Sequence, residues 1–328
     1  MAYNDDEFEA IARQVELIGQ RLSVPIQPRG EEGIAEVLFR AACENGFRKT
    51  STFAGILGLG RREMTPQSLA REHLDATRLA DFLGTRTRTD VESVIYPKLD
   101  RFGNRIRFFG RDVALKGFFT SHRRIAPRSL ADNLTLKAVW GVAGLSFDPD
   151  TRETLLTRCP ECGERASYTI GIALELCPGC YRKEVLVDFR KYPQPIAEAD
   201  DNEALDFALA LINPRLSIEQ LDFNILHACL AGHGPGELFQ LISHMAVAWE
   251  NSLNTAWLVS PAAQALATAS RAILDWPYGM GRFSEAIIRR NPMRQDPSTL
   301  AYAVCQSVGR DLRIRVLGAF QAGRRSRK

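Results

Sequence analysis

The stretch Cys159-Pro160-Glu161-Cys162-Gly163 is followed, after a short spacer, by Cys177-Pro178-Gly179-Cys180. Two Cys-x-x-Cys turns at this spacing supply the four thiolates that a tetrahedral zinc ion takes in a zinc ribbon. Gly163 and Gly179 suit the tight backbone of such knuckles, where a positive φ is often needed. Because four thiolates leave no open coordination position, the predicted zinc ion is structural and not catalytic.

The segment between the two pairs has apolar side chains at every second position, which is typical of β-strands. These residues are Tyr168, Ile170, Ile172, Leu174 and Leu176. The pattern predicts a small β-hairpin that carries the metal site. A dithiol redox pair is the alternative interpretation, but it accounts for one Cys-x-x-Cys and not for two at ribbon spacing. It also needs a βαβ context that the sequence lacks.

Composition limits the function classes. The chain has 328 residues, 45% of them hydrophobic, which is enough for two or more packed units. The net charge is only +3, so nucleic-acid binding would have to come from local clusters of basic residues. The start of the chain lacks the features of a signal peptide, and no apolar stretch is long enough to span a bilayer. Seven cysteines, four of them ligand-like, indicate a reducing cytoplasm rather than a disulfide framework.

Apolar residues at helical spacing predict a mainly α-helical chain around the ribbon. Stripes at 6–22 and 31–44, and a helix that begins at Thr65-Pro66 and runs to Gly84, form the N-terminal part. Residues 31–96 therefore have helix-turn-helix character. Further helices are expected at about 236–258, from Ser260-Pro261 to Asp275, and at 281–290 and 298–308.

These signals divide the chain into five parts. They are an amphipathic N-terminal helix or extension (1–27), a helical helix-turn-helix-like domain with a basic run (28–130), a Trp segment with the zinc ribbon (131–191), a C-terminal helical domain (192–320) and a basic tail (321–328). Because the chain ends in Gly-Arg-Arg-Ser-Arg-Lys, we expect the tail to be disordered and solubilising.

A basic run between positions 101 and 128 contains a single acidic residue, Asp112. Its cations are Arg101, Arg105, Arg107, Arg111, Lys116, Arg123, Arg124 and Arg128, and its aromatic residues are Phe102, Phe108, Phe109, Phe118 and Phe119. Basic and aromatic side chains together can bind phosphates and stack on bases, so the run is a candidate nucleic-acid surface. A solvated basic face above an ordinary phenylalanine core explains the pattern equally well.

Catalytic signatures are absent from the sequence. It contains no Gly-rich phosphate loop, no nucleophile elbow and no His-Glu-x-x-His pair. Asp148, Asp150 and Glu153 could serve a two-metal nuclease, but a turn with helix-capping acids is the favoured interpretation. We therefore expect no enzymatic activity.

The order of several motifs resembles the TniQ/TnsD family of transposition-targeting proteins over roughly residues 28–290. The motifs are Arg29-Gly30-Glu31-Glu32, Arg40-Ala41-Ala42-Cys43-Glu44-Asn45-Gly46 leading to Leu57-Gly58-Leu59, Leu136-Lys137-Ala138-Val139-Trp140, the cysteine pairs, and Ala272-Ile273-Leu274-Asp275-Trp276-Pro277 with Phe283 beyond it. The match is imperfect, because family members typically carry an earlier zinc site. Its two elements align here with Ala126-Pro127-Arg128-Ser129 and Asp148-Pro149-Asp150-Thr151, which keep the prolines but lack the ligands. Packing around Trp140 and Phe147 would then replace that first metal.

The resemblance implies a non-enzymatic adaptor in the bacterial cytoplasm. Such a protein links a target-recognising element to the AAA+ ATPase of a transposon. The target element is either its own DNA-binding surface or an RNA-guided effector, as in a CRISPR-associated transposon. Some members act as homodimers, and none of this requires a membrane. The chain is short for a member that reads DNA alone, so we expect a partner-dependent adaptor. The alternative is a zinc-ribbon DNA-binding regulator unconnected with transposition.

Overall fold

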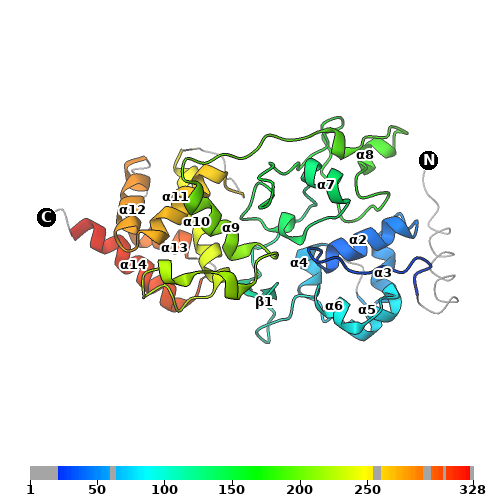
Figure 1. Cartoon of the computed structure of the whole chain (residues 1–328), viewed down its shortest axis with the longest axis horizontal. Helices are drawn as coiled ribbons and strands as arrows, with labels where there is room; N and C mark the ends of the chain where they lie inside the picture. Colours follow the sequence, from blue (N-terminus) through cyan, green and yellow to red (C-terminus); the bar gives the residue numbers. More distant parts are fainter. Residues whose placement is uncertain (1–20, 60–63, 254–259, 291–296, 306–307, 326–328) are drawn as a thin grey trace. The chain divides into compact units, whose positions relative to one another are not determined.

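The computed structural model describes residues 21–59, 64–253, 260–290, 297–305 and 308–325 (Figure 1). Within these ranges it contains thirteen α-helices and one two-stranded antiparallel sheet, which confirms the prediction of a mainly α-helical chain. The predicted stripe at 6–22 falls almost wholly outside the described residues. No described helix is both long enough and apolar enough to cross a bilayer.

The chain forms two compact units that interleave along the sequence. The first unit comprises Met1–Lys98, Phe119–Gly141 and Leu155–Gln194, and the second comprises Leu99–Phe118, Val142–Thr154 and Pro195–Lys328. The predicted segment 28–130 therefore contributes residues to both units rather than to one. The basic run of positions 101–128 is divided in the same way.

Short helices build the N-terminal part of the first unit. They are α2 (Ile34–Glu44), α3 (Ser51–Ile56), α4 (Pro66–Leu69), α5 (Ala76–Leu83) and α6 (Arg88–Glu92), drawn from blue to cyan in Figure 1. Thr65 caps α4 as predicted, but the expectation of one helix as far as Gly84 was wrong. The side chain of Asp75 accepts hydrogen bonds from the backbone of Thr77 and Arg78, so a separate helix, α5, begins there.

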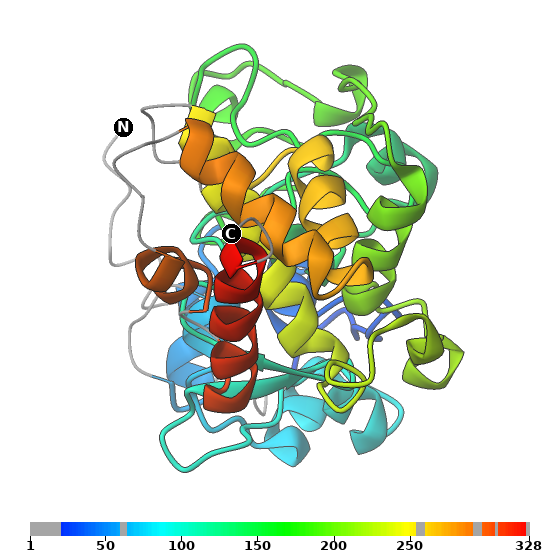
Figure 2. The same ribbon diagram turned by 90° about the vertical axis from the view of Figure 1, so that its left-hand side faces the viewer.

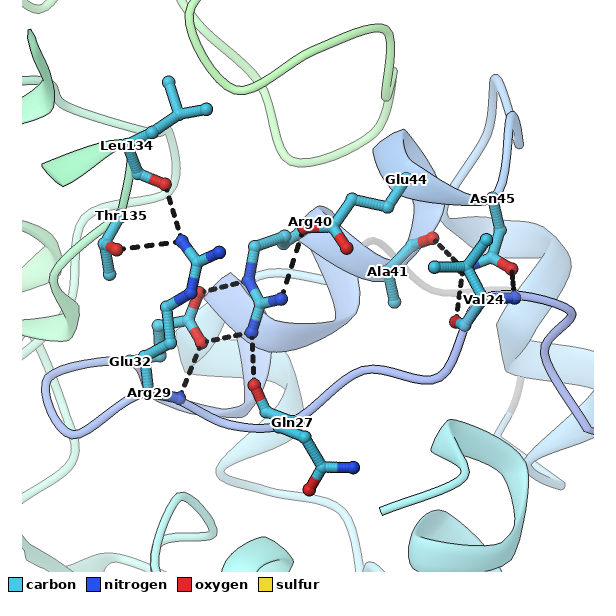
Figure 3. Close-up of polar contacts among 10 residues, drawn as sticks. All are labelled: Val24, Gln27, Arg29, Glu32, Arg40, Ala41, Glu44, Asn45, Leu134 and Thr135. Carbon is cyan, nitrogen blue, oxygen red and sulfur yellow. Dashed lines mark hydrogen bonds and ion pairs between the residues drawn. The ribbon is translucent and has the colours of Figure 1, made fainter.

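Helix α2 lies in the core of the first unit, with Ile34 to Ala42 all buried. Its buried Arg40 binds Glu32 with both Nε and Nη2, each at 2.7 Å, and Nη2 also donates to the carbonyl of Gln27 (Figure 3). Nη1 of Arg29 donates to the Leu134 carbonyl at 2.8 Å and to Thr135 Oγ1 at 2.9 Å. The backbone N–H of Arg29 donates to the Glu32 carboxylate. The pairing and the hydrogen bonds offset the cost of burying the charges of Glu32 and Arg40.

The remaining elements of the first unit are short. They are α7 (Pro127–Asn133), η1 (Ala138–Gly141), α8 (Pro178–Tyr181) and η2 (Phe189–Lys191). Trp140 in η1 is among its largest buried side chains. Ala138 N–H donates to the Glu31 carbonyl at 2.8 Å, which ties η1 to the segment that precedes α2.

The second unit is a helical bundle with one small hairpin. Strands β1 (Arg105–Phe108) and β2 (Arg111–Ala114) pair antiparallel, with Arg105 opposite Ala114 and Phe108 opposite Arg111. The other elements are α9 (Asn202–Ile212), η3 (Ile218–Gln220), η4 (Phe223–Ile225), α10 (Pro235–Leu253), α11 (Ala263–Leu274), α12 (Tyr278–Arg290), α13 (Pro297–Val304) and α14 (Arg310–Arg325). Helix α10 packs against α9, α11, α12, α13 and β2, and α14 packs against α12 and α13 (Figure 2).

The C-terminal end differs from the prediction. Helix α14 continues to Arg325, so the expectation that the last six residues are disordered was wrong for residues 323–325. The predicted helices near 260–275, 281–290 and 298–308 are present as α11, α12 and α13. The predicted helix at 236–258 is present as α10 up to Leu253, and 254–259 lie outside the described residues.

Candidate metal centre and cationic surfaces

The four cysteines of the two Cys-x-x-Cys pairs meet in the first unit. Their sulfur atoms all lie within 4.8 Å of one another, and Cys159–Cys180 and Cys162–Cys177 have Sγ–Sγ distances of 3.6 Å. A tetrahedral site with Zn–S bonds of about 2.3 Å implies sulfur separations of about 3.8 Å. The spacing and the donor set therefore fit a metal ion such as zinc. In the described part of the chain this is the only gathering of three or more potential ligand residues.

The backbone of each knuckle fixes the direction of its sulfurs. In the first knuckle Cys159 N–H donates to the Glu164 carbonyl and Gly163 N–H donates to the Cys159 carbonyl. Gly163 has φ +71°, so glycine is required there for the reason that the sequence suggests. Gly179 lies in α8 and is needed for space instead, because a Cβ there would lie 3.1 Å from Cys162 Sγ and closer still to Glu164.

The predicted β-hairpin between the cysteine pairs is not formed. Within the described residues the segment makes only isolated bridges, Arg158 with Arg165, Lys49 with Ile170, and Leu176 with Asp188. Backbone groups of Thr169 and Gly171 bond to the loop between α2 and α3 instead of to a second ribbon strand. Burial does not follow the alternating pattern, since Tyr168 and Leu174 are buried whereas Ile170, Ile172 and Leu176 are half-buried.

Three of the four thiols are buried, and Cys162 is half-buried. At Cys162 burial raises the pKa, but the backbone N–H of Glu164 and the neighbouring cysteines outweigh it, so its pKa is lowered. At Cys177 and Cys180 burial favours the neutral thiol when no metal is bound. Burial raises the pKa of Cys177 to about 11 and raises that of Cys180 as well. A metal takes up cysteine as thiolate, so binding at neutral pH would release protons and couple metal affinity to pH.

Three arginines of the basic run are buried, and their assignment to a nucleic-acid surface is corrected. Arg111, Arg123 and Arg124 are 1%, 1% and 3% exposed. Arg124 Nε donates to the Trp140 carbonyl at 2.6 Å, and burial lowers its pKa to about 10. Arg123 donates to the Leu174 carbonyl and lies 4.1 Å above the Phe39 ring. Each guanidinium group donates to a backbone carbonyl in the interior, although Nε and Nη2 of Arg123 have no hydrogen-bond partner, and at this burial the three groups are out of reach of a phosphate.

The second unit presents the exposed cations that remain near the hairpin. On β1, Arg105 and Arg107 point outward while Ile106 and Phe108 point inward. Arg101 lies 4.5 Å from the ring centre of Phe102, which is 70% exposed, and Lys116 is also exposed. Arg107 is paired with Asp112 at 2.8 Å, whereas no described acidic side chain pairs with the other three cations. Asp100 accepts three backbone hydrogen bonds, from Phe102, Asn104 and Arg105, and so fixes this turn.

Arg128 lies in the first unit, on α7, where it is exposed. Sequence reasoning missed two other cations there, Arg158 and Arg165, which are exposed and opposite each other beside the first knuckle. Their charges help to lower the pKa of His122, although burial is the larger cause. Residues 158–184 contain four basic and four acidic residues, so composition did not reveal this pair.

The acids near Asp148 serve a turn. Asp148 and Glu153 are fully buried, and Asp148 Oδ2 accepts from Thr151 Oγ1 at 2.8 Å. Asp150 contacts Asn213 and Arg215. These contacts match the turn that the sequence favoured, but no described helix begins at 148–153, so the acids do not cap a helix as expected. The aligned positions of the lost zinc site, 126–129 and 148–151, belong to different units, and Trp140 and Phe147 are buried as expected.

The chain matches no family model and no curated protein.

Proposed function

We propose that this protein is a non-enzymatic adaptor for transposition target selection, held together by one structural zinc ion and able to contact DNA. The proposal follows the resemblance to the TniQ/TnsD family in the order of motifs. Its partners would be a transposon AAA+ ATPase and either target DNA or an RNA-guided effector complex, in a bacterial cytoplasm, with homodimer formation compatible with this role.

One observation carries the DNA-binding part of the proposal. Around the hairpin of the second unit, Arg101, Arg105 and Lys116 are exposed beside the exposed ring of Phe102. Cations that lack an acidic partner gain most from contact with phosphate, because binding releases condensed counterions. An exposed aromatic ring next to an arginine provides a stacking surface for an unpaired base.

The metal site supports a structural role. Four thiolates complete the coordination shell of zinc, so a bound ion would cross-link the two knuckles and have no position for substrate. The ion would join residues 159–164 to residues 177–185, which otherwise contain little regular structure. Metal binding would then contribute directly to the folding of this part of the first unit.

The test is the salt dependence of DNA binding. Fluorescence anisotropy with a labelled duplex should give a linear plot of log K against log salt concentration. Replacing Arg101, Arg105 and Lys116 together by alanine should reduce the slope by about 3, because each lost phosphate contact removes about 0.9. Arg88→Ala is the matched control, since Arg88 is exposed but already paired with Glu92 at 2.7 Å.

An unchanged slope in the triple variant would refute the hairpin as the DNA contact. A regulator unconnected with transposition remains the second candidate, because it would use the same zinc site and the same cations. The two candidates differ in their protein partners: only the adaptor should associate with a transposition ATPase.

A further inference from the structure

The second unit contains an apolar groove with an acidic rim. It lies between α9, α11 and the turns η3 and η4, and it encloses about 450 Å³. Ligand sites commonly enclose roughly 300–1,000 Å³. The apolar side chains that the argument uses are Phe207, Leu211, Leu221, Phe223, Ile225 and Leu274.

Several of these apolar side chains are open to solvent in the described part of the chain. Ile225 is 52% exposed, and Phe207, Leu221 and Phe223 are half-buried. A concave, contiguous apolar surface with a polar rim is a feature of binding sites rather than of an ordinary surface.

Acidic groups outnumber basic ones on the rim. The acids that line the groove are Glu203, Asp206, Asp222 and Asp275. A fifth acid, Asp201, forms an ion pair with Arg271, which also lines the groove. The bases paired with them are Arg152, Arg271 and Arg282. Five carboxylates therefore face three guanidinium groups, and the side chains of Glu203 and Asp206 are 82% and 64% exposed. The rim favours a cationic ligand.

Buried Arg111 holds one wall of the groove in place. Its Nε donates to the Leu211 carbonyl at the end of α9 at 3.0 Å, and its Nη2 donates to the Leu216 carbonyl at 2.6 Å. The capping box of Ser217 and Gln220 and the cap that Asp222 provides for Asn224 order the segment that follows. A wall that is ordered before binding lowers the entropic cost of association.

We propose that this groove binds an amphipathic segment of a partner protein that presents apolar side chains flanked by lysine or arginine. Apolar anchors would fill the groove, and the flanking cations would meet the rim carboxylates. The N-terminal segment of the same chain is a poor occupant, since residues 1–20 carry five acidic residues against one arginine. The proposal does not depend on DNA binding, and its failure would leave the hairpin surface unaffected.

Three fluorescent probe peptides of about 18 residues test the proposal with the full-length chain. All three have leucine at positions i, i+3, i+4 and i+7, and their remaining positions combine alanine with lysine, glutamine or glutamate. By anisotropy at low salt, the lysine peptide should bind at least about tenfold more tightly than the glutamate peptide. The difference should shrink as salt is added.

Two groove variants and two controls decide the outcome. Ile225→Ser should weaken binding of the lysine peptide by about tenfold through loss of an apolar anchor. Glu203→Lys should reduce or reverse the difference in affinity between the lysine peptide and the glutamate peptide. Ile314→Ser on α14, where Ile314 is 59% exposed, and Glu92→Lys on α6 should leave binding unchanged. Equal binding of all three peptides would overturn the proposal. It would also be overturned if Ile314→Ser had as large an effect as Ile225→Ser, or if the groove bound a small apolar dye but no peptide.

Discussion

Removal of the charge on Glu32 should strongly destabilise the first unit. The side chains of Glu32 and Arg40 are 0% and 3% exposed, and two hydrogen bonds of 2.7 Å join them. Glu32→Gln leaves the guanidinium buried without its main counterion, a change that typically costs about 3–5 kcal/mol. Glu44 lies 3.2 Å from Arg40 Nη1 and is 38% exposed, so it compensates in part. We therefore expect the lower end of the range, about 3 kcal/mol.

Native-state hydrogen exchange with mass spectrometry can measure this loss separately in each unit. Amides of α2 report on the first unit, and amides of α10 serve as an internal reference in the second. The double variant Glu32→Leu with Arg40→Met replaces the pair by apolar side chains, which is often nearly neutral for buried pairs. It should be less destabilised than Glu32→Gln alone. A loss below about 1 kcal/mol for Glu32→Gln, or a double variant that is the least stable, would show that the pair is solvated and that this account of the core is wrong.

Three further predictions concern single positions. Burial raises the pKa of Glu36 from 4.5 to about 7. Its contribution to stability is therefore complete below pH 4.5 and is lost as pH rises through 7, a loss of about 3 kcal/mol. Glu36→Gln should abolish this pH dependence, measured by hydrogen exchange of α2 between pH 5 and 8. Gly279→Ala would place a Cβ 2.6 Å from the Ala272 carbonyl oxygen. It should destabilise the second unit by about 1–3 kcal/mol in the same assay. Amide exchange in α11 and α12 of this variant at the same rate as in the wild type would refute the close contact. Cys162→Ser, or zinc chelation, should remove bound zinc and speed up amide exchange in residues 159–190, while α10 stays protected from exchange. Full zinc content in the Cys162→Ser variant would exclude a four-thiolate site.

Local signals in the sequence were sufficient for several helices. The apolar periodicity of α2 and α11 and the cap at Thr65 are properties of neighbouring residues, and these elements are present. The break before α5 was missed because the apolar spacing continues across the cap at Asp75. The β1–β2 hairpin was missed because the inward-facing position 111 on β2 carries an arginine, which conceals the alternation.

The candidate sites show the same division between local and distant effects. The cysteine tetrad could be predicted because ligand spacing is local, and the structure brings all four sulfurs together. The burial of Arg111, Arg123 and Arg124 could not be predicted, since the carbonyls of Leu211, Leu216, Leu174 and Trp140 to which they donate lie 16 to 105 residues away along the chain. A long-range hydrogen bond leaves no trace in the composition of a basic run, so exposed and buried cations look alike in the sequence.

The most direct test of the adaptor function is an affinity purification of the tagged protein from its native host, with zinc quantified in the same sample. We predict recovery of a transposition ATPase or an RNA-guided effector complex, together with about one zinc ion per chain, as expected for a single four-thiolate site. Recovery of zinc and enriched DNA without either partner would contradict the adaptor function and favour a zinc-dependent DNA-binding regulator.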